Sequence, residues 1–286
     1  MPCGICGKGR DATKKAIRVI LILAAALLFI LWQNCSLQTE TFRVVDPALP
    51  QELDGLRVLE LADLHGRQFG AENRRLLRAA AAAKPDIICL DGDIFDEKTD
   101  LSMLAPLMRG LTAIAPTYYV TGNHEWQVDG LRDILTGLER LGVTVLENEF
   151  TVFSRGGAQI VIAGVNDPCG PYDQKTPSEL MDEIRAEYPD AFVLMLAHRN
   201  DTLPMWAELA PELVLTGHCH GGVVRLPAVG GVFGTRRDLF PDYDAGLYRQ
   251  GGTQLFVSRG LGYSRVRFRL FNRPQLPILV LKSGET

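Results

Sequence analysis

Histidine is scarce in this 286-residue chain, which holds only five. A net positive charge is missing outside the N-terminus: the first forty residues carry five Lys or Arg against Asp11 and Glu40, a net +3, so the total of −4 leaves −7 on the rest. An acidic body lacks the basic surface that binding to phosphate backbones requires, which excludes DNA and RNA as partners. Internal repeats, low-complexity tracts and a second linker are also absent, which favours one globular domain.

The six cysteines do not suggest a disulfide framework. Cys89, Cys169 and Cys219 lie in the body, and three cysteines cannot all pair with one another. Cys3 and Cys6 form a lone CxxC near the N-terminus, which is weak evidence for zinc without a second pair of ligands. Acylation near a membrane, or no role at all, stays open for these two residues.

Charge is missing altogether between Arg18 and Glu40, and the 14 residues from Val19 to Trp32 are all apolar. A run of this length fits either a signal peptide or a short transmembrane helix. We favour an uncleaved anchor over residues 19–37, because uncharged residues extend the run, Trp32 stands where an interfacial aromatic is expected, and no small-x-small cleavage site follows. A buried core helix would leave the basic flank unexplained.

The expected organisation is a basic cytoplasmic tail (1–18), the anchor or signal peptide (19–37) and, after a polar linker with prolines, one domain (42–286). Lys and Arg before an apolar run keep that end of the chain in the cytoplasm. We therefore expect a single-pass protein of the cell membrane with its domain outside the cytoplasm.

The body alternates predicted strands and helices, which indicates an α/β fold with βαβ units. Predicted strands cover 57–63, 87–93 and 117–125, and a predicted hairpin covers 143–165. Two later strands are predicted to end at His198 and His218. Predicted helices cover 71–86, 101–110, 129–142 and 177–188. The segments 253–260 and 277–282 are expected to close the fold as antiparallel strands.

Polar residues collect at the predicted strand ends. Asp63, Asp93 and Asn123 follow one another in steps of thirty, and all five histidines lie at strand exits. Carboxyl ends of neighbouring parallel strands meet at one sheet edge, where open α/β sheets bind ligands. If the chain is extended there, Asp63 and His65 point the same way, as do His218 and His220, while Cys219 faces away. A single histidine at a strand end is usually without function, but that reading does not explain why all five lie there.

This donor set predicts a metal centre. Imidazole and carboxylate together suit zinc, manganese, iron or cobalt, and seven ligands are too many for one tetrahedral ion. They fit two divalent ions that share a carboxylate. The seven candidate ligands are Asp63, His65, Asp93, Asn123, His198, His218 and His220, which leaves His124 over.

The motifs "DLH", "GDIFD", "GNHE", "AH" and "GHCHGG" occur in this order. In this the chain resembles the calcineurin-like metallophosphoesterases, and its later segments resemble the bacterial membrane-anchored subgroup of the YkuE and YaeI type. The resemblance implies a four-layer αββα sandwich of two mixed sheets with two metals, Mn, Fe or Zn, at one edge. The chain differs from the family pattern at Cys219, Val223, Arg199 and Asn200. These differences remove no ligand, but they weaken the inference of substrate specificity from the family.

The resemblance also implies roles. One metal is held by Asp63, His65, Asp93 and His220, and the other by Asp93, Asn123, His198 and His218. His124 is expected to protonate the leaving group, oriented by Asp96.

We therefore expect a phosphodiesterase or pyrophosphatase that uses a hydroxide shared by the two metals and acts on a lipid-linked or envelope-linked phosphate ester. A phosphomonoesterase with the same metals, and a catalytically silent, metal-stabilised extracytoplasmic binding module, remain alternatives. A metallo-β-lactamase-like hydrolase is disfavoured because the chain has no HxHxDH cluster.

Overall fold

A computed structural model describes residues 6–171, 173–234, 239–263, 266 and 268–284, with the side chains of residues 6–12 left out. Its α-helices are α1 (Cys6–Cys35), α2 (Arg74–Ala83), α3 (Leu104–Thr112), α4 (Leu131–Arg140), α5 (Pro177–Glu187) and α6 (Leu203–Leu209). Its strands are β1 (Gln38–Asp46), β2 (Arg57–Leu61), β3 (Ile87–Asp91), β4 (Thr117–Val120), β5 (Val143–Val145), β6 (Glu149–Arg155), β7 (Ala158–Gly164), β8 (Val193–Leu196), β9 (Leu213–Thr216), β10 (Arg225–Leu226), β11 (Gly230–Gly231), β12 (Gly246–Gln250), β13 (Thr253–Val257) and β14 (Gln275–Ser283).

Two six-stranded mixed sheets form the centre of the body. The strand order is β1-β14-β2-β3-β4-β5 in the first sheet and β12-β13-β9-β8-β7-β6 in the second, and β10 and β11 form a separate small hairpin. Strands β2 to β5 run parallel to one another, as do β7, β8, β9 and β13. The carboxyl ends of these two parallel sets supply the residues of the candidate site.

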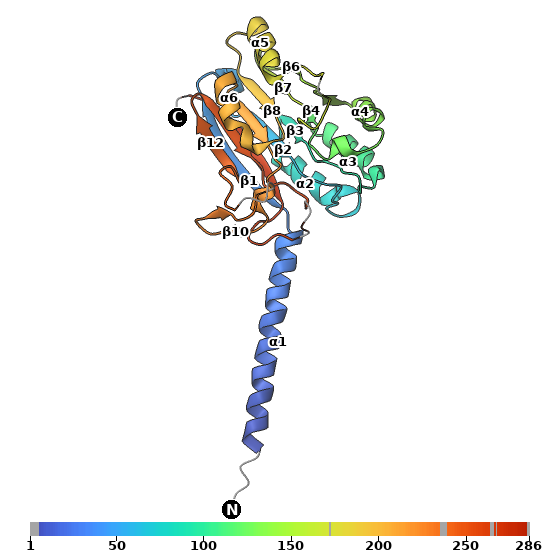
Figure 1. Ribbon diagram of the computed structural model, residues 1–286, viewed down its shortest axis with the longest axis vertical. Coiled ribbons are helices and arrows are strands. Elements are labelled where there is room, and N and C mark those ends of the chain that lie inside the picture. Colours follow the sequence, from blue (N-terminus) through green and yellow to red (C-terminus); the bar gives the residue numbers. More distant parts are fainter. Residues whose placement is uncertain (1–5, 172, 235–238, 264–265, 267, 285–286) are drawn as a thin grey trace, which may run out of the picture.

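The sheets stack face to face, with helices on both outer faces (Figure 1). Apolar side chains from both sheets fill the space between them, among them Val58, Ile87, Leu194 and Leu213. Helices α2, α3 and α4 cover the first sheet, and α5 and α6 cover the second. The helices are amphipathic; α4, for example, buries three leucines at positions 131, 135 and 138 and exposes its polar side chains. The expected four-layer sandwich with two mixed sheets is confirmed.

Several expected elements differ from those observed. The predicted linker, residues 41–55, overlaps β1, which pairs in parallel with β14 along its whole length, so the first part of this segment belongs to the first sheet. The expected closing strands are only half antiparallel: β13 is antiparallel to β12 but parallel to β9, and β14 is antiparallel to β2 but parallel to β1. The strands predicted over 57–63 and 87–93 end two residues early, at Leu61 and Asp91. The predicted helix 71–86 begins as a short 3₁₀ turn and ends at Ala83.

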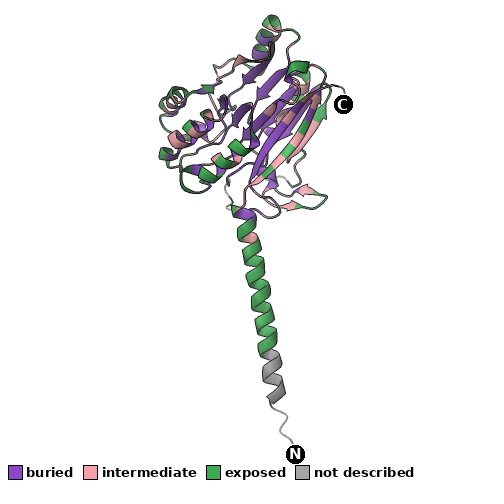
Figure 2. Cartoon of the chain, turned by 180° about the vertical axis from the view of Figure 1, so that it is seen from behind, coloured by how far each residue is buried: buried purple, intermediate pink, exposed green. Residues whose placement is uncertain are grey.

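Helix α1 projects from the body (Figure 1), and its section Thr13–Cys35 is long and apolar enough to cross a membrane. The side chains of residues 13–29 are exposed (Figure 2), and in the last turn Gln33 and Asn34 are buried against the body. The side chain of Asn34 forms a reciprocal pair of hydrogen bonds with the backbone of Arg269, accepting from its N–H at 2.8 Å and donating to its carbonyl at 2.9 Å. The helix therefore ends in specific contacts with the folded body.

Candidate metal centre

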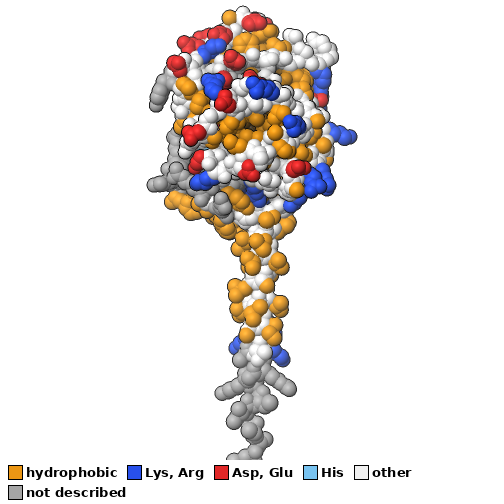
Figure 3. Space-filling model, turned by 90° about the vertical axis from the view of Figure 1, so that its right-hand side faces the viewer, with side chains coloured by type: hydrophobic (Ala, Val, Ile, Leu, Met, Phe, Trp, Pro, Cys, Tyr) orange, Lys and Arg blue, Asp and Glu red, His pale blue; other side chains and the backbone are white. Residues whose placement is uncertain are grey.

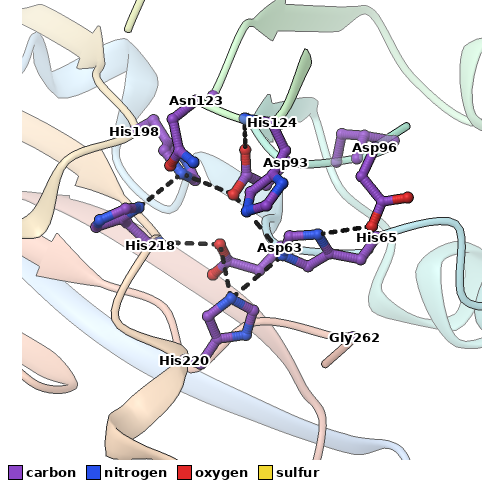
Figure 4. A network of polar contacts seen from close by, with 12 residues as sticks. Asp63, His65, Asp93, Asp96, Asn123, His124, His198, His218, His220 and Gly262 are labelled. Carbon is purple, nitrogen blue, oxygen red and sulfur yellow. Dashed lines mark hydrogen bonds and ion pairs between the residues drawn. The ribbon is translucent and has the colours of Figure 1, made fainter. Parts of the chain in front are cut away.

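The predicted ligands come from both sheets. Asp63 and His65 follow β2, Asp93 follows β3, and Asn123 follows β4, all in the first sheet. His198 follows β8 and the pair His218 and His220 follows β9, in the second sheet. Because the two sheets face each other, the carboxyl ends of their parallel strands meet at one edge, and Figure 4 shows the labelled side chains converging there.

Most of these residues lie on sharply kinked backbone, so the expected extended geometry was wrong. The φ angles are positive at Asp63 (52°), His65 (47°), Asp93 (51°), His218 (64°) and His220 (50°). Left-handed backbone at a non-glycine residue costs about 1–2 kcal/mol, and such strain persists where the surroundings enforce it. Here the kinked loops bind each other: the N–H of Asp63 donates to the carbonyl of Gly92 at 3.1 Å, and the N–H of His65 to that of Asp93 at 2.9 Å.

Two glycines let these loops approach. A Cβ on Gly122 would collide with the carboxylate of Asp93, and a Cβ on Gly260, whose φ is +66°, would lie 2.6 Å from the Cβ of Asp63. A glycine is thus required where each of the two carboxylates is packed against a neighbouring loop. Cys219, expected to face away from the site, is buried in the core between the second sheet and its helices.

The donor atoms fall into overlapping groups. Asp63, His65 and His220 each offer a ligand atom within 4.8 Å of the others, and so do Asp93, His198 and His218. A third group within the same limit joins Asp93 and His65 to His124.

Individual distances are short. The Nε2 atoms of His65 and His220 lie 3.2 Å apart, and His218 Nδ1 lies 3.2 Å from His198 Nε2. Asp93 Oδ2 lies 3.7 Å from His65 Nε2 and 3.3 Å from His198 Nε2. One carboxylate oxygen of Asp93 therefore lies between the two groups of ligands.

The donor chemistry fits cations. Oδ2 of Asp63 and Oδ1 of Asn123 are buried acceptors without a hydrogen-bond partner, and unpartnered buried polar atoms are costly. Pairs of imidazole nitrogens approach each other, an arrangement that a shared cation stabilises. The residues present fit two divalent ions, although the atoms themselves do not identify the metal.

The pKa shifts of Asp93 and His218 agree with that use, whereas neighbouring carboxylates outweigh burial and raise the pKa of His65 and of His198, which must each release a proton to bind a metal. Burial raises the pKa of Asp93, but the neighbouring His198 and His65 outweigh it and hold the pKa of this carboxyl well below its ordinary value. Burial lowers the pKa of His218 to about 3. Near neutral pH, Asp93 is therefore a carboxylate and His218 a neutral imidazole, which are the forms that bind metals.

His124 and Asp96 lie beside these groups, but not in the expected arrangement. Asp96 was predicted to orient His124; instead its Oδ2 lies 3.4 Å from Nδ1 of His65, and its Oδ1 accepts from Thr99 Oγ1 at 2.8 Å. Glu97 Oε2 lies 3.7 Å from Nδ1 of His124. The prediction failed because GDxxD gives the spacing of its acidic residues but not which histidine the turn after β3 brings next to Asp96.

The site opens into a pocket of about 410 Å³. Among its lining residues are His65, Arg67, Asp96, Glu97, His124 and Tyr263. The pocket is thus lined by imidazole and carboxylate groups and also by Arg67, whose guanidinium carbon lies 4.3 Å from the centre of the Tyr263 ring. A substrate group in this pocket would lie next to His124 and the ligand His65.

Sequence reasoning missed a buried glutamate. Glu125, in the GNHE motif, accepts hydrogen bonds from the N–H groups of Asp93 (2.9 Å), Ile94 (2.7 Å) and Gly122 (2.9 Å). Its carboxylate joins the loop after β3 to the loop after β4. Its place directly after His124 was the only signal in the sequence.

An arginine and an aspartate were also missed as part of the site. Arg199 was noted only as a departure from the family pattern; its guanidinium forms a two-point ion pair with Asp167, at 2.5 and 3.0 Å. Another nitrogen of Arg199 lies 3.2 Å from Nε2 of His218. A permanent positive charge thus stands next to the second group of ligands.

Two adjoining groups of histidine and carboxylate side chains, at the edge of a double-sheet sandwich, fit the metal site of a dinuclear metallohydrolase. Residues 56–222 match the family described as calcineurin-like phosphoesterase. The chain is 33% identical over 233 residues to the phosphodiesterase YaeI of Escherichia coli (strain K12), covering 79% of this chain and 82% of that protein. It is 28% identical over 255 residues to the metallophosphoesterase YkuE of Bacillus subtilis (strain 168), covering 86% of each.

A third relative, the transmembrane protein with metallophosphoesterase domain of Bos taurus, is 28% identical over 251 residues, which is 82% of this chain and 55% of that protein. The chain therefore belongs to the calcineurin-like phosphoesterase family and is a metal-dependent phosphoester hydrolase. The candidate span in α1 agrees with a membrane protein.

Proposed function

We propose that the protein is a two-metal phosphodiesterase or pyrophosphatase, anchored in the cell membrane, which hydrolyses a lipid-linked or envelope-linked phosphate ester. The observation that carries the proposal is the position of Asp93 between two groups of metal-ligating side chains. Asp63, His65, Asp93 and His220 would hold one ion. Asp93, Asn123, His198 and His218 would hold the other.

When bound, two such ions supply Lewis-acid stabilisation of phosphate oxygens and an activated water near neutral pH. The protein contributes the rest. Asp96 would orient the ring of His65 by its contact with Nδ1. The other ring nitrogen, Nε2, then points toward Asp93. The positive charge of Arg199 would attract the anionic substrate to the second group of ligands.

His124 is the proposed general acid. It lines the pocket, its side chain is 24% exposed, and its backbone N–H donates to Asp93 Oδ1 at 2.9 Å, which holds the backbone of His124 beside the centre. Protonating the leaving oxygen is worth about 10² to 10⁴ in rate. The role of Asp96 in this step passes to Glu97, whose carboxylate faces His124 Nδ1.

The class of substrate is supported by two facts. The relative YaeI is named a phosphodiesterase. Tyr263, which lines the pocket, contacts the end of α1, since its Oη donates to the carbonyl of Asn34 at 3.2 Å. A pocket beside a membrane anchor suits a substrate held in the same membrane. Basic residues before the span support a cytoplasmic N-terminus and an extracytoplasmic domain.

The test uses the full chain purified in detergent. Metal analysis should find two divalent ions per chain, and the metal-loaded protein should hydrolyse bis-p-nitrophenyl phosphate faster than p-nitrophenyl phosphate. The reverse preference would establish the phosphomonoesterase alternative. Two bound metals with no turnover of either ester would leave only the silent binding module.

A further inference from the structure

Exposed apolar side chains of the body are concentrated in one stretch. Among the described residues, nine large hydrophobic side chains outside α1 are exposed, and seven of them lie between residues 226 and 271. Six form what we call the apolar base: Leu226, Val229, Phe233, Leu239, Phe240 and Phe271, each between 42% and 62% exposed. The seventh is Val266.

The segments that carry the apolar base are held together by backbone pairing. Leu226 and Val229 lie on the β10–β11 hairpin, which stands beside the upper end of α1 in Figure 1. A β-bridge pairs Phe233 with Leu239. A second bridge pairs Val224, next to the hairpin, with Leu270, which directly precedes Phe271. Several segments that are far apart in the sequence thus place their apolar side chains together.

The apolar base reaches the level of the membrane span. The ring of Phe271 lies 5.7 Å from that of Phe29, which is six residues before the end of α1. At 1.5 Å per residue, Phe29 is about 9 Å below the end of the helix, within the apolar section Thr13–Cys35. A side chain that touches Phe29 is therefore at the depth of the span.

Groups typical of a membrane interface stand just above. The guanidinium carbon of Arg273 lies 4.7 Å from the centre of the Trp32 ring, and Arg273 donates to the carbonyl of Leu37 at 3.0 Å. Tryptophan and arginine are preferred at the headgroup level of a bilayer. Figure 3 shows the hydrophobic surface of α1 leading up to the underside of the body.

The body is held to α1 by several hydrogen bonds. Besides the reciprocal pair between Asn34 and the Arg269 backbone, the carbonyl of Asn34 accepts from Tyr263 and from Arg67, and Ser36 Oγ accepts from Arg273 at 2.8 Å. These contacts fix the height and direction of the body relative to the helix. The apolar base consequently has one position relative to any membrane that α1 crosses.

We propose that the apolar base inserts into the lipid bilayer beside α1, so that the body rests on the membrane surface instead of standing clear of it. A bilayer is the occupant because the surface is continuous with a helix that must itself be surrounded by lipid, and because Phe271 reaches the depth of that helix. One consequence rests on the proposed function: a lipid-linked phosphate ester enters the pocket from the bilayer, past Arg67 and Tyr263.

The depth of individual residues tests insertion without any use of catalysis. The full chain, with Cys3, Cys6, Cys35 and Cys169 replaced by serine, is reconstituted into nanodiscs of phosphatidylcholine and phosphatidylglycerol. Spin labels are placed through Val229→Cys or Phe240→Cys. The matched controls are Leu101→Cys and Met205→Cys, the remaining exposed large apolar residues in the described part of the body, at 38% and 37%.

Labels at 229 and 240 should be reached by oxygen more readily than by a water-soluble nickel chelate, and the two control labels should show the reverse. Water-like accessibility at 229 and 240 would overturn the proposal. So would protection of these labels from both probes, since that marks contact with a second copy or another protein.

A variant with Phe233→Ser, Leu239→Ser and Phe240→Ser tests delivery of the substrate. It should hydrolyse soluble bis-p-nitrophenyl phosphate at the normal rate, but its rate on a phosphodiester lipid in the nanodisc should fall about tenfold or more, because the pocket loses its position over the membrane. A normal rate on the lipid would overturn delivery from the bilayer. Failure of the unmodified chain on both esters would refute the proposed function and leave the depth measurement to decide insertion.

Discussion

Replacing Asn34 with alanine should loosen the contact between anchor and body in a measurable way. Asn34 is only 9% exposed. Its side chain accepts a hydrogen bond from the N–H of Arg269 and donates one to the Arg269 carbonyl, and Arg269 is itself only 2% exposed. Alanine leaves these two backbone groups without partners. An unpartnered buried polar group costs about 1–3 kcal/mol, so about 2–4 kcal/mol is expected for the pair after partial relaxation.

This loss of free energy sets the expected increase in the hydrogen-exchange rate of the Arg269 amide. A tenfold change corresponds to about 1.4 kcal/mol, so the amide of Arg269 should exchange about 30- to 700-fold faster in Asn34→Ala. Exchange mass spectrometry of the full chain in detergent would report on the peptide that covers residues 268–274. The matched control is Leu31→Ala, which truncates a side chain that is 51% exposed on the same helix.

Two results would refute the reasoning. If exchange at Arg269 changes less than about threefold, the Asn34 contact does not hold the body to α1. If β8, in the centre of the second sheet, also exchanges faster, the variant unfolds as a whole and the contact is not local.

Three further predictions concern the metal centre. His124→Ala should keep both metals and lower kcat by about 10² to 10⁴; loss of metal would instead make His124 a ligand. Asp93→Ala should reduce occupancy of both sites in metal analysis, and two retained metals with normal activity would contradict a bridging role. Arg199→Ala should lower kcat/KM for an anionic phosphodiester by about tenfold or more, since a hydrogen bond from a charged donor is worth about 1.5–3 kcal/mol. Arg155→Ala, which breaks an ion pair with Asp86 outside the site, is its control and should have no effect.

The layered fold and the meeting of the ligands could be predicted because they follow from periodicity. The alternation of apolar strands with amphipathic helices predicts parallel sheets, and parallel strands necessarily bring their carboxyl ends to one edge. Asp63 and Asp93 could therefore be placed together without knowing the loops between them. The observed β2–β3–β4 order agrees with this.

The local geometry of the loops could not be predicted. Positive φ at Asp63, Asp93 and His218 depends on contacts from other segments, such as the bond from the N–H of Gly262 to the carbonyl of Asp63 at 2.6 Å. No pattern within a few residues carries that information. The same holds for β1, whose partner β14 lies more than two hundred residues later, so its segment was interpreted as a linker.

Arg269 connects these two parts of the molecule, the anchor and the metal centre, and its substitution should affect one ligand group selectively. Its backbone binds Asn34, while its guanidinium donates to the carbonyls of Gly262 (2.7 Å) and Arg259 (2.8 Å) and lies 3.5 Å from Nδ1 of His220. Burial lowers the pKa of Arg269 to about 9, so it remains protonated near neutral pH.

The loop that Arg269 holds also supports Asp63, through the N–H of Gly262 and through Gly260. Lysine at position 269 offers one nitrogen where the guanidinium uses three, two on the Gly262 carbonyl and one on that of Arg259, so Arg269→Lys should weaken metal binding by the Asp63, His65 and His220 group by about 10- to 100-fold. The link from this loop to the His198 and His218 group is indirect, through Asp63, whose Oδ1 accepts from the N–H of His218 at 3.0 Å, so that group should keep its metal. Metal titration of the full chain should then show one tight and one weakened ion, whereas Arg273→Lys, which alters only the contact with α1, should leave two tight ions. Equal loss of both ions in Arg269→Lys would show that the loop supports the whole centre and not one ligand group.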